Sequence, residues 1–194
     1  MSLSTTELLN KYSKDISHSE EVCRISLMIF DAVNQTLKEM SEKQRKYLEI
    51  ASILHDVGHS INSKNHNKYS QKIILENGLE GFDERQKRII SCIARYHRGS
   101  LPDKKEHEIY CLLDKKDRKI VKRLAGILRI ADGLDKAHMH LIKNLRINYD
   151  YENNIVEIYI ICETPEFRPD IFPAIRKKDL FEIGFKTQVI FKFE

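Results

Sequence analysis

The spacing of the apolar residues changes near residue 142, and this change limits the folds open to the chain. From about residue 4 to 142, apolar residues recur at helical spacing, as on helices that bury one face. From about residue 143 onward they alternate with polar residues and are enriched in β-branched and aromatic types, which is typical of strands. We therefore expect a mainly α-helical bundle over residues 1–142, followed by a small α+β lobe over residues 143–194.

Local signals place the elements within these two parts. Ser17 followed by Glu20, and Asp83 followed by Gln86, are capping patterns that begin helices. Helices are expected over about 17–37, 42–56, 67–76, 83–97 and 114–131. In the lobe we expect strands at 145–149, 156–162 and 188–193, a helix near 170–182, and an antiparallel sheet of about three strands.

Composition excludes several classes of protein. The 194 residues are 41% hydrophobic and 32% charged, with a net charge of +4, which fits an ordinary globular protein. The longest apolar run, Ile158 to Cys162, is far shorter than the roughly 20 residues of a membrane span, and the first residues do not resemble a secretory signal. The four cysteines are scattered, which favours reduced thiols in the cytoplasm and excludes a thiolate zinc site. The basic balance permits an anionic ligand, but no basic motif with interleaved aromatic residues points to nucleic acid.

A set of imidazoles and carboxylates falls mostly at predicted helix ends. The set is His18, His55, Asp56, His66, His97 and Asp132. Each residue taken alone has a structural reading, such as a surface histidine or an exposed acid. Collectively they are harder to explain, because His55-Asp56 and Asp132 directly follow strongly apolar helical segments, where polar groups are costly unless satisfied. Nitrogen and oxygen donors brought to one buried point suit iron, manganese, zinc or magnesium.

These residues and their neighbours resemble a known family. His18, Leu54-His55-Asp56-Val57-Gly58-His59, Arg95-Tyr96-His97-Arg98 and Leu128-Arg129-Ile130-Ala131-Asp132 resemble an HD-domain phosphohydrolase. More narrowly, they resemble the C-terminal HD-type region of the exopolyphosphatase/guanosine pentaphosphate phosphohydrolase (Ppx/GppA) family, from about Ser13 to the C-terminus. The resemblance implies that His18, His55, Asp56 and Asp132 hold one divalent metal. It further implies that His66 and His97 hold a second metal, bridged to the first by Asp56.

The sequence departs from that family in ways that limit what can be transferred. The family's actin-like N-terminal domains have no counterpart in these 194 residues, so we expect a free-standing HD domain and do not carry over exopolyphosphatase activity. The loop that the family often writes as His-His-Lys-His-Ser reads His66-Asn67-Lys68-Tyr69-Ser70 here. The six-residue ligand set is complete, as it is in binuclear HD enzymes that split diadenosine tetraphosphate. A complete set favours an active domain over a vestigial one.

The resemblance predicts a mechanism and a group of phosphate-binding residues. His55 and Asp56 would be catalytic, at a binuclear site that activates a water as hydroxide for attack on phosphorus. Basic side chains near the ligands are candidates for binding substrate phosphate: His59, Lys64, Lys68, Arg95, Arg98 and Arg129. The structural alternative is that Arg95 and Arg98 only decorate a helix end and that Arg129 pairs with an acid.

Other polar residues have no assigned chemistry at this stage. Asp135 could support a metal ligand, bind a ribose or form a structural salt bridge. His107, His138 and His140 are interpreted as surface residues.

The leading hypothesis is a metal-dependent phosphohydrolase acting on a nucleotide or nucleoside polyphosphate. A binding module for an alarmone, a polyphosphate or a partner actin-like phosphatase is the alternative, and an RNA-binding domain is a weaker third. An edge of the small sheet could also pair two copies into a homodimer.

Overall fold

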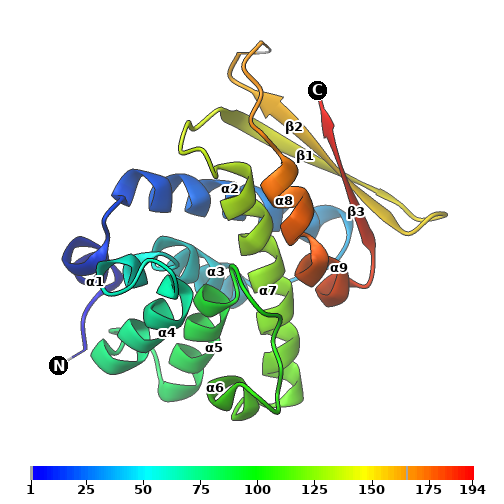
Figure 1. The fold of residues 1–194 in the computed structure, drawn as a ribbon. Coiled ribbons are helices and arrows are strands. Elements are labelled where there is room, and N and C mark those ends of the chain that lie inside the picture. Colours follow the sequence, from blue (N-terminus) through cyan, green and yellow to red (C-terminus); the bar gives the residue numbers. More distant parts are fainter. Residues whose placement is uncertain (1, 165) are drawn as a thin grey trace.

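Helices build the first three quarters of the molecule. The computed structural model describes residues 2–164 and 166–194. In this part of the chain the helices before the sheet are α1 (Thr5–Tyr12), α2 (Ile16–Thr36), α3 (Glu42–Ile53), the 3₁₀ turn η1 (Val57–Ser60), α4 (His66–Asn77), α5 (Glu84–Arg95), α6 (Glu108–Cys111) and α7 (Lys115–Leu134) (Figure 1). Within those described ranges, no helix is both long enough and apolar enough to cross a membrane.

The helices begin where short polar side chains cap them. Ser41 with Gln44, and Asp83 with Gln86, form complete capping boxes at the starts of α3 and α5. For α2 the cap is Asp15, whose carboxylate accepts a hydrogen bond from the amide of His18 at 2.9 Å, so this helix begins slightly before the predicted Ser17.

Two helices of the structure were not predicted from the sequence, and a third is shorter than predicted. Two short helices, α1 and α6, were not predicted. The predicted helix over 42–56 ends earlier, at Ile53, and a turn followed by η1 takes its place. This early end is important for the site, because it releases the two residues after Leu54 from helical geometry.

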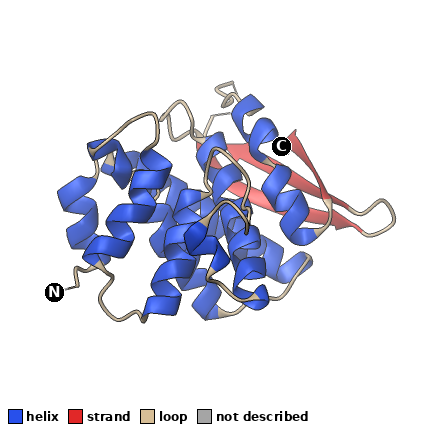
Figure 2. Cartoon of the chain, turned by 60° about the horizontal axis from the view of Figure 1, so that its bottom comes forward, coloured by secondary structure: helices blue, strands red, loops and turns tan. Residues whose placement is uncertain are grey.

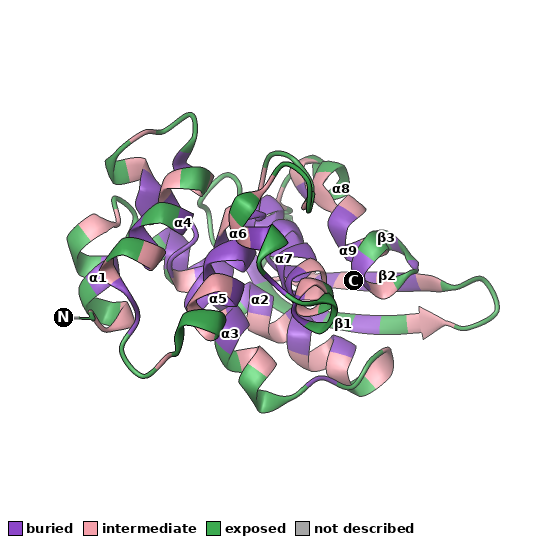
Figure 3. Cartoon of the chain, turned by 90° about the horizontal axis from the view of Figure 1, so that it is seen from below, coloured by how far each residue is buried: buried purple, intermediate pink, exposed green. Residues whose placement is uncertain are grey.

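Helix α7 is the centre of the hydrophobic core. Its C-terminal half is buried at every position from Leu124 to Leu134, because neighbouring elements cover all of its sides. It packs against α2, α3 and α5 within the bundle and against two short helices of the C-terminal lobe, α8 (Phe172–Lys177) and α9 (Asp179–Phe185). Figure 3 shows buried residues concentrated where α2, α5 and α7 meet.

The C-terminal lobe is a three-stranded sheet with two short helices. The strands are β1 (Ile142–Asp150), β2 (Ile155–Cys162) and β3 (Gln188–Phe193), in the order β1-β2-β3. The sheet lies at one end of the molecule, with its β1–β2 hairpin projecting outward (Figure 2). The predicted combination of a helical part and a small α+β lobe is confirmed.

The pairing within the sheet corrects one detail of the prediction. Strands β1 and β2 are antiparallel, as expected for a hairpin, but β3 runs parallel to β2, so the sheet is mixed rather than antiparallel. A parallel neighbour requires a crossover connection, and α8 and α9 supply it. The single helix predicted near 170–182 is accordingly two helices.

Both edges of the sheet have side chains bound to their backbone. Arg24 of α2 donates to the carbonyls of Ile142 and Lys143 on β1. On β3, the amide of Val189 donates to the carboxylate of Glu182 at 2.9 Å. The homodimer through a sheet edge stays a prediction, and so does the division of the chain at residue 142.

Glycines on α7 allow the lobe to pack closely on the bundle. A Cβ added at Gly133 would lie 2.6 Å from the backbone of Ala174 in α8, and one added at Gly126 would lie 2.6 Å from the backbone of Phe181 in α9. Neither neighbour is a flexible side-chain end, so neither contact could relax cheaply. The two glycines lie two helical turns apart and therefore form one flat face for the lobe.

Replacing one of these glycines tests this contact. We expect Gly133→Ala to lower the free energy of unfolding by about 1–3 kcal/mol, because overpacking outweighs the gain in helix propensity. Urea unfolding measures the change, with Lys116→Ala on the exposed side of α7 as a control that stays within about 0.5 kcal/mol of the parent protein. A Gly133→Ala protein as stable as its parent would refute the close approach.

Candidate functional site

Six polar side chains singled out by the sequence lie together between the helices. They are His18 in the first turn of α2, His55 and Asp56 in the turn after α3, His66 at the start of α4, His97 just after α5, and Asp132 in the last turn of α7. All are buried except Asp56, which is partly exposed. Because each stands at a helix end, side chains from distant parts of the sequence can share one region.

Three of the histidines are held in the same way. The Nδ1 atom of each ring lies within 2.7–2.8 Å of the backbone carbonyl three residues earlier. These pairs are His55 with Ser52, His66 with Ser63, and His97 with Ala94. A carbonyl can only accept a hydrogen bond, so each Nδ1 carries the proton and, in the neutral ring, each Nε2 presents a lone pair.

These lone pairs converge on one carboxylate oxygen. Oδ1 of Asp56 lies 3.1 Å from Nε2 of His66 and 3.4 Å from Nε2 of His97. Nε2 of His55 is 3.5 Å from the same oxygen. The Nε2 atoms of His66 and His97 are themselves only 3.1 Å apart. Acceptors this close repel one another unless a proton or a cation lies among them.

Two atoms of the cluster lack the hydrogen-bond partner that a buried polar atom usually has. Nε2 of His55 and Oδ1 of Asp56 are buried and have no hydrogen-bond partner among the residues that the structure describes. A buried, unsatisfied polar atom costs free energy, and each one in a native structure calls for an explanation. Imidazole nitrogens and carboxylate oxygens are the donors that divalent metals such as zinc, manganese and iron bind. The residues present therefore fit a divalent cation.

The electrostatic environment of Asp56 also suits a cation. Burial alone would raise the pKa of Asp56, but nearby His55, His66 and His97 outweigh it and hold that pKa well below the usual range. Burial, together with the neighbouring His55, holds the pKa of His97 well below its usual range. An ionised carboxylate beside a neutral imidazole is the combination that metal binding requires.

The other side of the cluster is formed by His18 and Asp132. Nε2 of His18 is 3.5 Å from Oδ1 of Asp132, and Nε2 of His55 is 3.8 Å from that oxygen. On its opposite side, Nδ1 of His18 lies 2.9 Å from Oδ2 of Asp135, so this carboxylate fixes the ring orientation. Burial opposes a charge on His18, yet the hydrogen bonds to Asp132 and Asp135 raise its pKa to about 9. Of the three roles considered for Asp135, the structure favours support of His18.

Close packing around Gly58 holds the His55-Asp56 turn in place. The hydroxyl of Ser70 on α4 donates to the carbonyl of His55 at 2.6 Å and accepts from the amide of Gly58 at 2.9 Å. A Cβ added at Gly58 would lie 2.0 Å from the carbonyl oxygen of His66, so only glycine allows α4 to approach this turn. The same contact therefore positions His55, Asp56 and His66 relative to one another.

A cavity of about 230 Å³ opens beside the cluster. It is lined by Asp56, His66, His97, Arg98, Gly99, Asp132, Lys136 and Lys177. The carboxylates and imidazoles thus lie at one side of a space whose remaining charged groups are cations. Such a space suits an anion bound next to the carboxylates and imidazoles of the cluster.

A comparison with family models identifies the family to which the chain belongs. Residues 2–165 match the model described as Ppx/GppA phosphatase, domain III. The chain belongs to the Ppx/GppA phosphatase family. This match confirms the resemblance to the Ppx/GppA family seen in the sequence, and the matched region contains all six residues of the cluster.

Of the phosphate-binding residues predicted for this Ppx/GppA family member, Arg98 lines the cavity, and His59 contacts two residues that line it. Arg98 lines it, with Nη1 3.3 Å from Nδ1 of His66. The ring of His59 stacks on that of His66 at 3.7 Å between centroids, and Nε2 of His59 is 3.7 Å from Oδ2 of Asp56.

The other predicted phosphate-binding residues lie elsewhere. Arg129 is buried, donates to backbone carbonyls and pairs with Asp179. This is the ion pair with an acid that was the structural alternative to phosphate binding. Arg95 donates to Gln71 and lines a different pocket, with His107. Lys64 and Lys68 are exposed and are not among the residues that line the cavity.

Two cavity residues of this Ppx/GppA family member were not predicted from the sequence. Lys136 stands four residues after Asp132, a helical spacing that could have pointed to it. Lys177 comes from α8, and no sequence signal connects it with the cluster. His138, interpreted as a surface residue, is exposed but stacks on His18 with ring centroids 3.8 Å apart.

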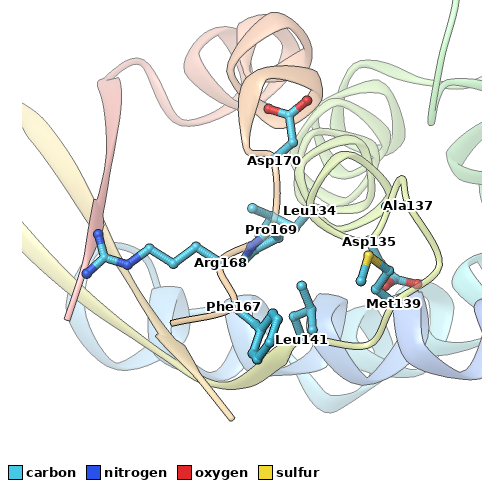
Figure 4. A pocket seen from close by; sticks show the side chains of 9 residues that line it. All are labelled: Leu134, Asp135, Ala137, Met139, Leu141, Phe167, Arg168, Pro169 and Asp170. Atoms are coloured by element: carbon cyan, nitrogen blue, oxygen red, sulfur yellow. The ribbon is translucent and has the colours of Figure 1, made fainter. Parts of the chain in front are cut away.

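A second cavity, of about 210 Å³, lies beyond the C-terminal end of α7 and is mostly apolar (Figure 4). Leu134, Met139, Leu141 and Phe167 line it, and its Arg168 extends away and lies over the ring of Phe193 at 4.9 Å. No imidazole is among its lining residues in the described part of the chain. We therefore place the candidate site of this Ppx/GppA family member in the first cavity.

The raised pKa of His18 predicts how the metal-free protein responds to pH. Unfolded histidine has a pKa near 6.5, so the stabilisation from protonated His18 is complete below about pH 6.5 and is lost as pH rises through about 9. We expect chelator-treated protein to lose stability of the order of 3 kcal/mol across this interval. Urea unfolding at pH 6 and pH 9.5 measures the loss.

Two variants separate His18 from other histidines. His18→Gln should remove most of the pH dependence between 6.5 and 9. His107→Gln should keep it, because burial lowers the pKa of His107 from its ordinary value near 6.5, so this group titrates below the interval. An unchanged dependence in His18→Gln would contradict the assignment.

Proposed function

We propose that this chain is an HD-type, metal-dependent phosphohydrolase that acts on a nucleotide or nucleoside polyphosphate. The observation that carries the proposal is the convergence of imidazole Nε2 lone pairs on Asp56, with two buried acceptors left without a partner. Membership of a phosphatase family and the cations around the adjoining cavity support it.

The donor set divides into two groups that share Asp56. His18, His55, Asp56 and Asp132 would hold one divalent cation, and Asp56, His66 and His97 would hold a second. The metal would be iron, manganese, zinc or magnesium, since all donors are nitrogen or oxygen. Such a pair of cations supplies an activated water and stabilises charge on phosphoryl oxygens.

The chain's own residues bind and orient the substrate. Arg98, Lys136 and Lys177 stand around the cavity, where cations can bind the oxygens of more than one phosphoryl group. Burial of the histidines excludes bulk water from one side of the reacting group and strengthens electrostatic interactions there. Asp135 and the carbonyls of Ser52, Ser63 and Ala94 keep the imidazoles in one tautomer and orientation.

Metal analysis tests the proposed centre. Untagged protein purified without chelator should contain about two equivalents of a transition metal. His66→Ala and His97→Ala should each reduce the content toward one equivalent, because both belong to the second group. No bound metal after incubation with iron, manganese and zinc would overturn the proposal and favour the binding module.

Phosphate release tests the activity. We expect Asp56→Ala to lower turnover of nucleoside polyphosphates by at least about 100-fold, since it removes the carboxylate shared by both groups, while circular dichroism shows the fold intact. Asp31→Ala is the matched control, because Asp31 forms a partly exposed ion pair with Arg45 outside the cavity. Full activity of Asp56→Ala would exclude the metal mechanism.

A further inference from the structure

Lys177 is a cation that the C-terminal lobe supplies to the cavity. Its ammonium group pairs with Oδ2 of Asp132, while Oδ1 of Asp132 faces His18 and His55. The ammonium therefore lies on the cavity side of Asp132, away from His18 and His55. Lys177 also lies outside the part of the chain that matches the family model, which ends at residue 165.

The fold holds the backbone of Lys177 firmly. Ala174, one turn earlier in α8, packs directly against Gly133 of α7. At the end of α8, Nε of Arg129 donates to the carbonyl of Lys177 at 3.2 Å. Nη1 of the same arginine donates at 3.2 Å to the carbonyl of Tyr96, the residue before His97. Arg129 thus joins the segment that carries Lys177 to the segment that carries His97.

The charge on Asp132 determines what Lys177 does. Without a metal, the ammonium is a nearby cation that neutralises this buried carboxylate, with which it forms an ion pair. A divalent cation bound by Asp132 would take over that neutralisation and repel the ammonium. The side chain is one-fifth exposed and flexible, so it can turn into the cavity, where an anionic ligand would sit.

We propose that Lys177 is a substrate-binding residue that neutralises Asp132 in the metal-free protein and binds phosphoryl oxygens once the metals are in place. This inference rests on the proposed function. It gives the C-terminal lobe a direct part in the site, because the helical part alone lacks this cation. It also predicts that replacing Lys177 changes the affinity for a divalent metal and the affinity for phosphate in opposite directions.

The experiment measures metal and phosphate affinity separately. Mn²⁺ binding to chelator-treated protein, and inorganic phosphate binding to the Mn²⁺-loaded protein, are followed by isothermal titration calorimetry. In Lys177→Met we expect Mn²⁺ to bind several-fold tighter, because a competing cation is gone, and phosphate to bind about 10–100-fold weaker. Lys177→Arg should restore most of the phosphate affinity.

A neighbouring cation controls for general charge effects. Arg176 is exposed on the same helix and lies over Phe172, so Arg176→Met removes one charge without touching the cavity. We expect it to leave both affinities within about twofold. If Lys177→Met weakens both ligands together, Lys177 is only structural; if phosphate affinity does not change, Lys177 does not bind substrate. Either result overturns the inference.

Failure of the proposed function would look different. Parent protein that binds no Mn²⁺ overturns the metal mechanism, and the inference with it. In a second case the parent protein binds Mn²⁺ and phosphate, and Lys177→Met has the expected effects on both, but no phosphate compound is hydrolysed. This result overturns the proposed hydrolase activity and supports Lys177 as a phosphate ligand.

Discussion

One oxygen of Asp56 faces three imidazole nitrogens, and the rest of the site is arranged around this contact. The histidines cannot turn away, because each Nδ1 is bound to the carbonyl three residues earlier. The resulting cluster of acceptors is unfavourable by itself and becomes favourable when positive charge enters it. Holding these acceptors together lowers the stability of the folded protein and prepares a position for a ligand, as functional sites often do.

Helix α7 connects that cluster to the remainder of the molecule. Its C-terminal end carries Asp132, which belongs to the cluster, and Asp135, which is hydrogen-bonded to the ring of His18. Gly133 at the same end makes the contact with α8. One helix, buried at every position of its C-terminal half, thereby fixes the positions of groups from both parts of the chain. Arg129, predicted to bind phosphate, serves the same purpose by bonding to backbone carbonyls on both sides.

Much of the fold and the six clustered residues could be predicted because their signals are local. Capping boxes, apolar periodicity and the His55-Asp56 pair after an apolar helix are all short-range patterns. The misses have long-range causes. The direction of β3 depends on how α8 and α9 connect it to β2. The structural role of Arg129 depends on backbone carbonyls that come close to it only in the folded chain.

The sequence by itself determined a helical part, an α+β lobe, the family, and a set of histidine and aspartate side chains at helix ends. Only the tertiary structure decided which basic residues face the cavity, since a lysine or arginine carries no local sign of its partner. Lys177 reaches Asp132 across 45 positions of sequence because glycines let two helices touch. Side-chain partners over such distances are set by packing, which no short pattern encodes.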